Sequence, residues 1–209
     1  PIKSSAASDV YKRQTCLCMG AGITMAQGFN VIEPDKKAIA FVGDSTFFAS
    51  GMTGAANAVY NKHDITIVVL DNATTAMTGS QPHPGTGATL MGGFSAPISI
   101  QEVLSALGVK KITKANPLFA DKAIEAAREA IDYDGPSAVI YESPCTKLTK
   151  AKPPVYFIAN ACAGCRKCVT TIGCPALGWS EVGHSIVINR AMCVGCGLCT
   201  DICEYGAIT

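Results

Sequence analysis

The sequence predicts an α/β domain built on a parallel β-sheet, followed by a small cysteine-rich domain of the α+β class. Three features predict this order. Short apolar segments alternate with helical segments up to residue 142, two runs of closely spaced cysteines follow residue 160, and a basic segment ending in two prolines separates them. A chain of 209 residues can hold one full domain and one small one. Its formal net charge of +1 gives no indication of a nucleic acid or an anionic membrane as a partner.

These features divide the chain into four segments. Residues 4–14 resemble the in-frame translation of a sequencing adapter, so we expect residues 1–14 to be a non-native or disordered tail. The α/β domain is expected over residues 15–146, the linker over 147–154 and the cysteine-rich domain over 155–209. Because the native sequence then starts abruptly near Thr15, we expect the first domain to be truncated at its N-terminus.

Four apolar runs predict strands, and four other segments predict the helices that alternate with them. The expected strands lie at 37–42, 65–70, 109–113 and 137–142. The run ITIVVL at 65–70 is unbroken, which is typical of a central strand buried on both faces. The expected helices lie at 19–29, 51–60, 99–107 and 119–131. The first two are rich in small residues, the third has Ser99 as N-cap with Glu102 at the capping-box position, and the last is amphipathic. This alternation predicts a parallel sheet.

Two cysteine runs dominate the C-terminal domain. The first is C-x2-C-x2-C-x5-C-P from Cys162, and the second is C-x2-C-x2-C-x3-C from Cys193. Three thiolates at two-residue gaps fit three corners of a [4Fe–4S] cluster, and the fourth cysteine of each run binds the other cluster. The predicted ligands are Cys162, Cys165, Cys168 and Cys203 for one cluster, and Cys193, Cys196, Cys199 and Cys174 for the other. This is the pattern of bacterial two-cluster ferredoxins, except for the longer gap before Cys174 and for Glu204, where proline is usual.

A zinc site and a disulfide framework are weaker interpretations of the cysteines. Zinc sites usually have paired rather than tripled cysteines, and a disulfide framework suits a small secreted chain. Eleven cysteines beside a large α/β domain indicate a reducing compartment, and we expect a cytoplasmic, anaerobic protein. The three remaining cysteines, Cys16, Cys18 and Cys145, are expected to be small buried apolar groups. Polar or glycine positions interrupt every apolar run well before membrane-spanning length.

Polar residues follow two of the predicted strands. Gly43, Asp44 and Ser45 come after the first strand, and Asp71 and Asn72 after the second. In parallel α/β sheets, ligands bind at these carboxyl ends of the strands. A carboxylate oxygen of Asp44, the amide oxygen of Asn72 and a backbone carbonyl would leave room for diphosphate oxygens on Mg²⁺. Gly43 lets the backbone approach the phosphates. An ordinary βα loop is the alternative.

The two motifs resemble the thiamine diphosphate motif, in which Gly-Asp-Gly precedes an Asn at a similar distance; Ser45 replaces the second glycine. The stretches CMGAGITMAQG, GDSTFFASGMTGAANAVYN and LDNATTAMTGSQPHPGTG, followed by both cysteine runs, resemble the C-terminal part of the indolepyruvate:ferredoxin oxidoreductase α subunit. This resemblance covers residues 15–209. It implies a thiamine diphosphate-binding domain followed by a bacterial-type ferredoxin domain.

The resemblance also implies an activity, which is the oxidative decarboxylation of arylpyruvates with coenzyme A. The products would be an acyl-CoA and CO2, with electrons passing through two [4Fe–4S] clusters to ferredoxin. By the same resemblance Asp44, Asn72 and the carbonyl of Thr74 hold Mg²⁺, while Asp71 orients the loop. A small second subunit and a catalytic glutamate upstream of this chain would complete the active site. We therefore expect the chain to be inactive alone.

A Gly/Pro-rich loop at 78–87 is expected to cover the cofactor, and Gln81 and His83 are its candidate substrate contacts. Neither His63 nor His184 is given a role. Two alternatives stay open. One is another 2-oxo-acid:ferredoxin oxidoreductase, of the pyruvate type. The other is a pure electron-transfer iron–sulfur module, in which the α/β domain binds no cofactor.

Overall fold

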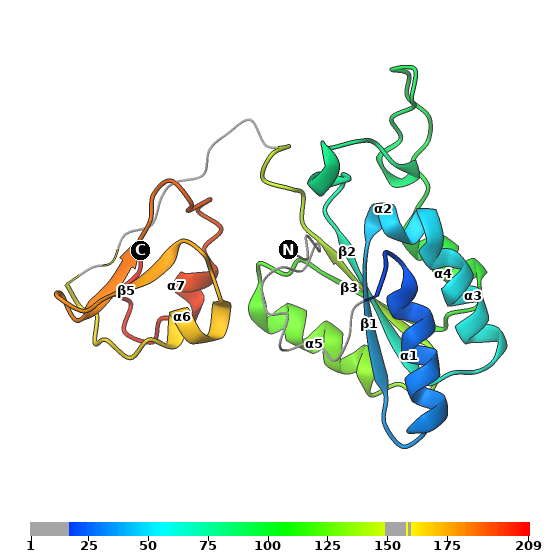
Figure 1. Ribbon diagram of the computed structural model, residues 1–209, viewed down its shortest axis with the longest axis horizontal. Coiled ribbons are helices and arrows are strands. Elements are labelled where there is room, and N and C mark those ends of the chain that lie inside the picture. The colour runs from blue at the N-terminus through cyan, green and yellow to red at the C-terminus, as the bar shows by residue number, and fades with distance from the viewer. Residues whose placement is uncertain (1–16, 149–157, 159) are drawn as a thin grey trace. The chain divides into compact units, whose positions relative to one another are not determined.

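The computed structural model of the chain describes residues 17–148, 158 and 160–209, and Figure 1 shows its ribbon. These residues form two compact units, which divide between Cys145 and Thr146. The expected tail at 1–14, most of the expected linker at 147–154, and Cys16 lie outside the described residues. Within the part of the chain that is described, no helix has the length and apolar character needed to cross a membrane.

The first unit contains a four-stranded sheet in which every neighbouring pair of strands is parallel. Its order is β1-β2-β4-β3, with the strands β1 (Ala38–Gly43), β2 (Ile65–Asp71), β3 (Lys111–Ala115) and β4 (Ser137–Glu142). The two central strands are β2 and β4, and the first five residues of β2 are all buried. The predicted parallel-sheet fold is therefore confirmed.

Four helices of nearly the predicted extent cover this sheet (Figure 1). They are α1 (Ala21–Ile32), α3 (Met52–Tyr60), α4 (Ile100–Ala106) and α5 (Ala120–Ile131). The first three pack on one face, where Ile23, Ala55 and Leu104 join a common core with alternate residues of β1, β2 and β4. On the other face, α5 packs through Ala126 and Ala130. Small residues allow the close approach, since a Cβ on Gly54 would lie 3.1 Å from the Ile23 side chain.

The ends of α4 follow local chemistry. The Ser99 hydroxyl accepts a hydrogen bond from the backbone N–H of Glu102 at 3.2 Å, so the predicted N-cap is confirmed. At the other end, Gly108 has φ of 101° and the backbone N–H of Val109 donates back to Leu104. Val109 is therefore part of the helix end and its side chain is buried. For this reason β3 begins at Lys111, two residues later than the apolar pattern predicts.

The segment after β1 is helical from an earlier residue than expected. A short helix, α2 (Asp44–Thr46), is followed by a π-helical turn, Phe47–Gly51, which continues into α3. The sequence predicts a helix only from residue 51. The π-helical turn widens the helix and places Phe47 and Phe48 in the core. Asp44 thus becomes the first helical residue after the strand, where the N-terminal end of the helix favours a negative charge.

The second unit is small and α+β. Its antiparallel hairpin consists of β5 (Leu177–Ser180) and β6 (Ser185–Ile188), and its helices are α6 (Lys167–Ile172) and α7 (Leu198–Ile202). An isolated antiparallel bridge joins Ile158 to Ile208. The buried core consists of Cys168, Leu177, Ile186 and Ile208, with several further cysteines packed against it.

Candidate functional site

Asp44 is buried at the carboxyl end of the sheet, with 1% of its surface exposed. Its Oδ1 accepts the backbone N–H of Ser45 at 2.8 Å. Its Oδ2 accepts the backbone N–H of Asn72 at 3.1 Å, which connects the end of β1 to the end of β2. This connection follows from the parallel register, because Gly43 pairs with Leu70 and the residues that follow each strand meet at one edge. A carboxylate is thus held rigidly in a nearly water-free position.

The turn after β2 carries the second group of oxygens. The Asp71 carboxylate accepts the backbone N–H of Ala73, and the Asn72 amide oxygen accepts the N–H of Thr74. These bonds hold Ala73 at a φ of 60°, a left-handed conformation that costs a residue with a Cβ about 1 kcal/mol. Burial raises the pKa of Asp71, and the carboxylates of Asp44 and Glu142 raise it further, against the lowering effect of the Ala73 hydrogen bond. Strain and paired carboxylates are features of a binding site rather than of a plain connection.

His83 reaches this site from the following loop. Its Nε2 lies 3.1 Å from Oδ2 of Asp44, and its Nδ1 accepts the backbone N–H of Gly85 at 3.2 Å. The ring stacks on Phe48, with 5.7 Å between the ring centroids and 28° between the planes. The sequence indicates His83 only as a substrate contact in the loop. Its contact with Asp44, 39 residues away, is visible only in the structure.

Gln81 lies differently. Its side chain is exposed and bends back on its own loop, accepting a hydrogen bond from the Thr78 hydroxyl at 2.7 Å and donating one to the Thr78 carbonyl at 2.8 Å. A substrate contact at Gln81 stays a prediction. Thr74 lies in the turn after β2, and its carbonyl accepts the N–H of Ala76 at 3.0 Å. A carbonyl oxygen has a second lone pair, so this bond leaves Thr74 able to bind a cation.

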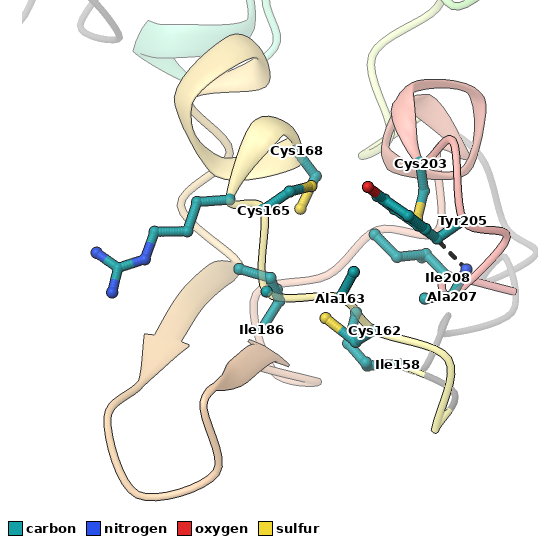
Figure 2. A pocket seen from close by; sticks show the side chains of 12 residues that line it. Ile158, Cys162, Ala163, Cys165, Cys168, Ile186, Cys203, Tyr205, Ala207 and Ile208 are labelled. Carbon is teal, nitrogen blue, oxygen red and sulfur yellow. Dashed lines mark hydrogen bonds between the residues drawn. The ribbon is translucent and has the colours of Figure 1, made fainter.

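In the second unit, Figure 2 shows Cys162, Cys165, Cys168 and Cys203 around one cavity. The rest of the lining is mostly apolar and includes Ile186 and Ile208, together with Arg166 and Tyr205. These four cysteines form the set that the spacing predicts for one cluster. Burial raises the pKa of the Cys168 thiol, and the charges of Cys203 and Cys165 raise it further. A raised pKa favours the protonated thiol of Cys168, so binding of iron to this sulfur would be coupled to release of its proton.

The second predicted set also comes together. Burial raises the pKa of the Cys199 thiol, and the nearby Cys196, Cys193 and Cys174 raise it further. Cys174 comes from the first run, so the chain exchanges one cysteine between the sets in each direction. Among the described residues, no three His, Cys, Asp or Glu side chains approach as closely as a single ion requires. The thiolates around a cubane bind separate irons and stand further apart than the ligands of one ion.

The two cysteine runs have matching backbones. Gly164 and Gly195 occupy equivalent positions with φ of 69° and 68°. Arg166 and Gly197 follow at the start of each helix, again with positive φ. In addition, the backbone N–H of Gly195 points at the Cys193 sulfur at 3.4 Å, and the N–H of Ala207 at the Cys203 sulfur at 3.3 Å. Such bonds stabilise sulfur that carries negative charge.

The cysteine spacing does not predict two other contacts in this unit. Lys167 forms an ion pair with Glu204, the residue that replaces the usual proline, and this bond raises the pKa of Lys167. It joins α6 to the segment after α7. The guanidinium of Arg166 lies 3.9 Å from the ring centroid of Trp179. Lys167 and Glu204 are 37 positions apart, so no local pattern around either residue predicts their ion pair.

The remaining cysteines correct one expectation. Cys18 is exposed and Cys145 is partly exposed, so the prediction that both are buried is wrong. Cys18 precedes α1 in the described chain, and Cys145 follows the last strand of the sheet. Neither residue belongs to a helix or strand, and neither is part of the buried core of the first unit.

Comparison with known families decides the class of the first unit. The C-terminal TPP binding domain of thiamine pyrophosphate enzymes matches residues 2–141. The chain belongs to this family. A 4Fe-4S binding domain matches residues 186–209, which include the second cysteine run. The chain therefore carries a thiamine diphosphate-binding domain and an iron–sulfur domain, as its sequence predicts.

Curated relatives extend the match across both units. The chain is 37% identical over 198 residues to indolepyruvate oxidoreductase subunit IorA of Archaeoglobus fulgidus, which covers 92% of this chain and 31% of the relative. A subunit of the same name from Thermococcus kodakarensis is 33% identical over 204 residues, covering 90% and 31%. The predicted resemblance is confirmed, and the chain spans about a third of the length of these relatives.

Two further matches are named for 2-oxoglutarate. The 2-oxoglutarate synthase subunit KorB of Archaeoglobus fulgidus is 29% identical over 143 residues, covering 64% of this chain and 52% of the relative. The solved 2-oxoglutarate:ferredoxin oxidoreductase of Magnetococcus marinus aligns with a TM-score of 0.56 at 22% identity, covering 63% of this chain and 47% of that one. The second match supports the fold alone.

The residues at the edge of the sheet fit the cofactor of this family. Asp44 supplies a buried carboxylate, and Asn72 and Thr74 each keep a free lone pair on a hard oxygen. Mg²⁺ prefers such oxygens and retains positions for phosphate oxygens. The two cysteine sets likewise supply four sulfurs each with backbone donors beside them.

Proposed function

We propose that this chain is the cofactor-binding and electron-transferring part of a thiamine diphosphate-dependent 2-oxo-acid:ferredoxin oxidoreductase that acts on arylpyruvates. One observation carries the proposal. The same chain combines the buried Asp44 site at the end of a parallel sheet with two converging sets of four cysteines. A decarboxylating site on the same chain as iron–sulfur clusters suits a reaction that releases electrons of low potential.

The chemistry of the reaction explains why both parts are needed. The bond between the keto carbon and the carboxylate breaks, CO2 leaves, and a thioester bond forms to coenzyme A with release of the thiol proton. The two electrons set free reduce two ferredoxins, each of which accepts one. Thiamine diphosphate, when bound, supplies the electron-accepting ring that makes the loss of CO2 possible. The cysteine sets would hold two [4Fe–4S] clusters, which carry single electrons.

Within this scheme the residues of the chain have distinct tasks. Asp44, Asn72 and the carbonyl of Thr74 would hold the Mg²⁺ that binds the diphosphate, and Asp71 would keep the turn in shape. The loop 78–87 would exclude water above the cofactor, with Gln81 as a candidate contact to the oxo acid. The catalytic glutamate and part of the substrate pocket would come from the rest of the complete protein and from a small second subunit. We further propose a cytoplasmic, anaerobic setting.

The names of the curated relatives support an arylpyruvate as the substrate. Matches over nine-tenths of the chain have names that contain indolepyruvate, while the 2-oxoglutarate match covers 64% of it. The experiment is to mix the complete protein and its partner subunit anaerobically with thiamine diphosphate, Mg²⁺ and coenzyme A. Visible cluster absorbance is then followed after addition of indolepyruvate, pyruvate or 2-oxoglutarate. We expect rapid bleaching with indolepyruvate.

Each alternative function predicts a different outcome. Faster bleaching with pyruvate or 2-oxoglutarate keeps the reaction and overturns the aryl substrate. Bleaching by dithionite but by none of the acids leaves only an electron-transfer module. Asp44→Asn should then have no consequence, whereas the proposal expects it to abolish bleaching by any acid and leave reduction by dithionite intact. Asp132→Asn, a change at an exposed aspartate, is the matched control.

A further inference from the structure

The two carboxylate oxygens of Asp44 differ in how many further partners they can accept. Oδ2 lies at hydrogen-bond distance from two nitrogens, the backbone N–H of Asn72 and Nε2 of His83, both at 3.1 Å. Oδ1 accepts one bond, from the N–H of Ser45 at 2.8 Å. Each carboxylate oxygen accepts about two hydrogen bonds. Oδ2 therefore already has two nitrogen partners, whereas Oδ1 has one and keeps a position for a cation, and the neighbouring Asp71 carboxylate adds negative charge at this place.

The hydrogen bond from Gly85 determines the tautomer of His83. A backbone N–H can only donate, so Nδ1 of His83, which receives it at 3.2 Å, carries no proton. The proton of the neutral ring is then on Nε2, from where it is donated to Asp44. Both ring nitrogens have a partner, which leaves neither free for a substrate. A neutral ring also adds no positive charge that would repel Mg²⁺.

Packing holds the ring in this orientation. The His83 side chain is 5% exposed and stacks on Phe48, a residue of the π-helical turn after Asp44. Gly85 passes so close that a Cβ there would lie 2.9 Å from the Phe48 ring and 3.1 Å from Cε1 of His83. The same helical segment therefore presents both the carboxylate and the surface on which the histidine lies.

We propose that His83 is a positioning residue for Asp44, which fixes Oδ2 through a neutral Nε2–H donor and thereby turns Oδ1 toward the divalent cation of the cofactor site. This inference rests on the proposed function, since it takes Asp44 as a cation ligand. It gives His83 a task other than contact with the 2-oxo acid. Partners of this kind typically contribute a factor of roughly 10–100 to metal affinity.

The test compares His83→Leu with His83→Gln in the complete protein. Both variants lose the ring and its stacking on Phe48, but the glutamine amide can place an N–H donor near the position of Nε2. Mn²⁺ replaces Mg²⁺, and its binding is followed by electron paramagnetic resonance at saturating thiamine diphosphate. We expect His83→Leu to weaken Mn²⁺ binding roughly 10–100-fold and His83→Gln to restore most of it. Thermal unfolding and iron content should be alike in the two variants.

Each contrary outcome has a defined meaning. Equal Mn²⁺ affinity in the two variants overturns the inference, whether both are weak or both normal. Normal Mn²⁺ affinity with a raised KM for the oxo acid shows a substrate contact instead, and also overturns it. If His83→Leu does not fold, His83→Asn replaces it, because its shorter amide cannot reach Asp44. Absence of thiamine diphosphate-dependent Mn²⁺ binding in the unchanged protein contradicts the proposed function itself.

Discussion

The two units of this chain obtain their order from different sources. In the first unit, sixteen buried residues from the sheet, three helices, the π-helical turn and the end of α4 form one core, which needs no cofactor to exist. In the second, the buried core has four residues, one of which is Cys168, and four further cysteines are packed against it. A unit with so little apolar burial depends on bonds from its cysteines to metal for stability. The fold of the first unit therefore exists without its cofactor, whereas the fold of the second unit depends on the clusters that it binds.

Removal of iron should produce the largest difference in stability between the two units. Anaerobic chelation of iron from the complete protein is expected to unfold the second unit and leave the first intact, because only the second relies on metal–sulfur bonds. Hydrogen exchange read by mass spectrometry checks this. Amides of β5 and β6 should lose protection while those of β2 and β4 keep it. Persistent protection in β5 and β6 would show that the second unit does not depend on metal for its fold.

Loss of one exchanged cysteine should remove one cluster. In Cys203→Ser, the iron content is expected to fall by about half, since one of two clusters loses a ligand. Alkylation mapped by mass spectrometry should then label Cys162, Cys165 and Cys168, whose set includes Cys203 in the structure. Labelling of Cys193 instead would show that each run binds its own cluster. Cys18→Ser, at an exposed cysteine, is the control with unchanged iron.

A cavity created by substitution in the core of the first unit should destabilise that unit and leave the iron–sulfur unit unaffected. Leu104 is fully buried in the core between α4 and the sheet. Leu104→Ala is expected to lower the free energy of unfolding of that unit by about 2–5 kcal/mol, from lost burial and the cavity left behind. Denaturant unfolding measures the loss, and iron content should not change. Leu90→Ala, at a side chain that is 94% exposed, should change stability by less than about 0.5 kcal/mol.

The smallest effect is expected at a helix cap. Ser99→Ala removes the hydroxyl that accepts the N–H of Glu102 and should cost the first unit about 1 kcal/mol. Ser99→Asp keeps an acceptor at the same position and should retain nearly full stability. Thermal unfolding of the two variants measures the difference. Equal losses in both would show that the cap contributes through something other than this hydrogen bond.

Local patterns predicted most of the elements because each has a short-range cause. The unbroken run at 65–70 became a central strand, and the predicted cap at Ser99 is present. The start of β3 was missed because the turn at Gly108 keeps Val109 in the end of α4, and the helix from Asp44 was missed because it continues through a π-helical turn that the periodicity does not indicate. The exposed position of Cys18 was missed for a similar reason, because burial depends on neighbours that lie far away in the sequence.

By itself, the sequence determined the order of strands and helices, the placement of Asp44 and Asn72 after neighbouring strands, and which cysteines could share a cluster. Periodicity, strand direction and cysteine spacing are enough for these, because they act over a few residues or follow from one topological rule. Only the tertiary structure decided that His83 contacts Asp44 and that Lys167 pairs with Glu204. Those contacts join segments 39 and 37 residues apart, and the path of a loop back to the sheet or cluster depends on the packing of the whole unit.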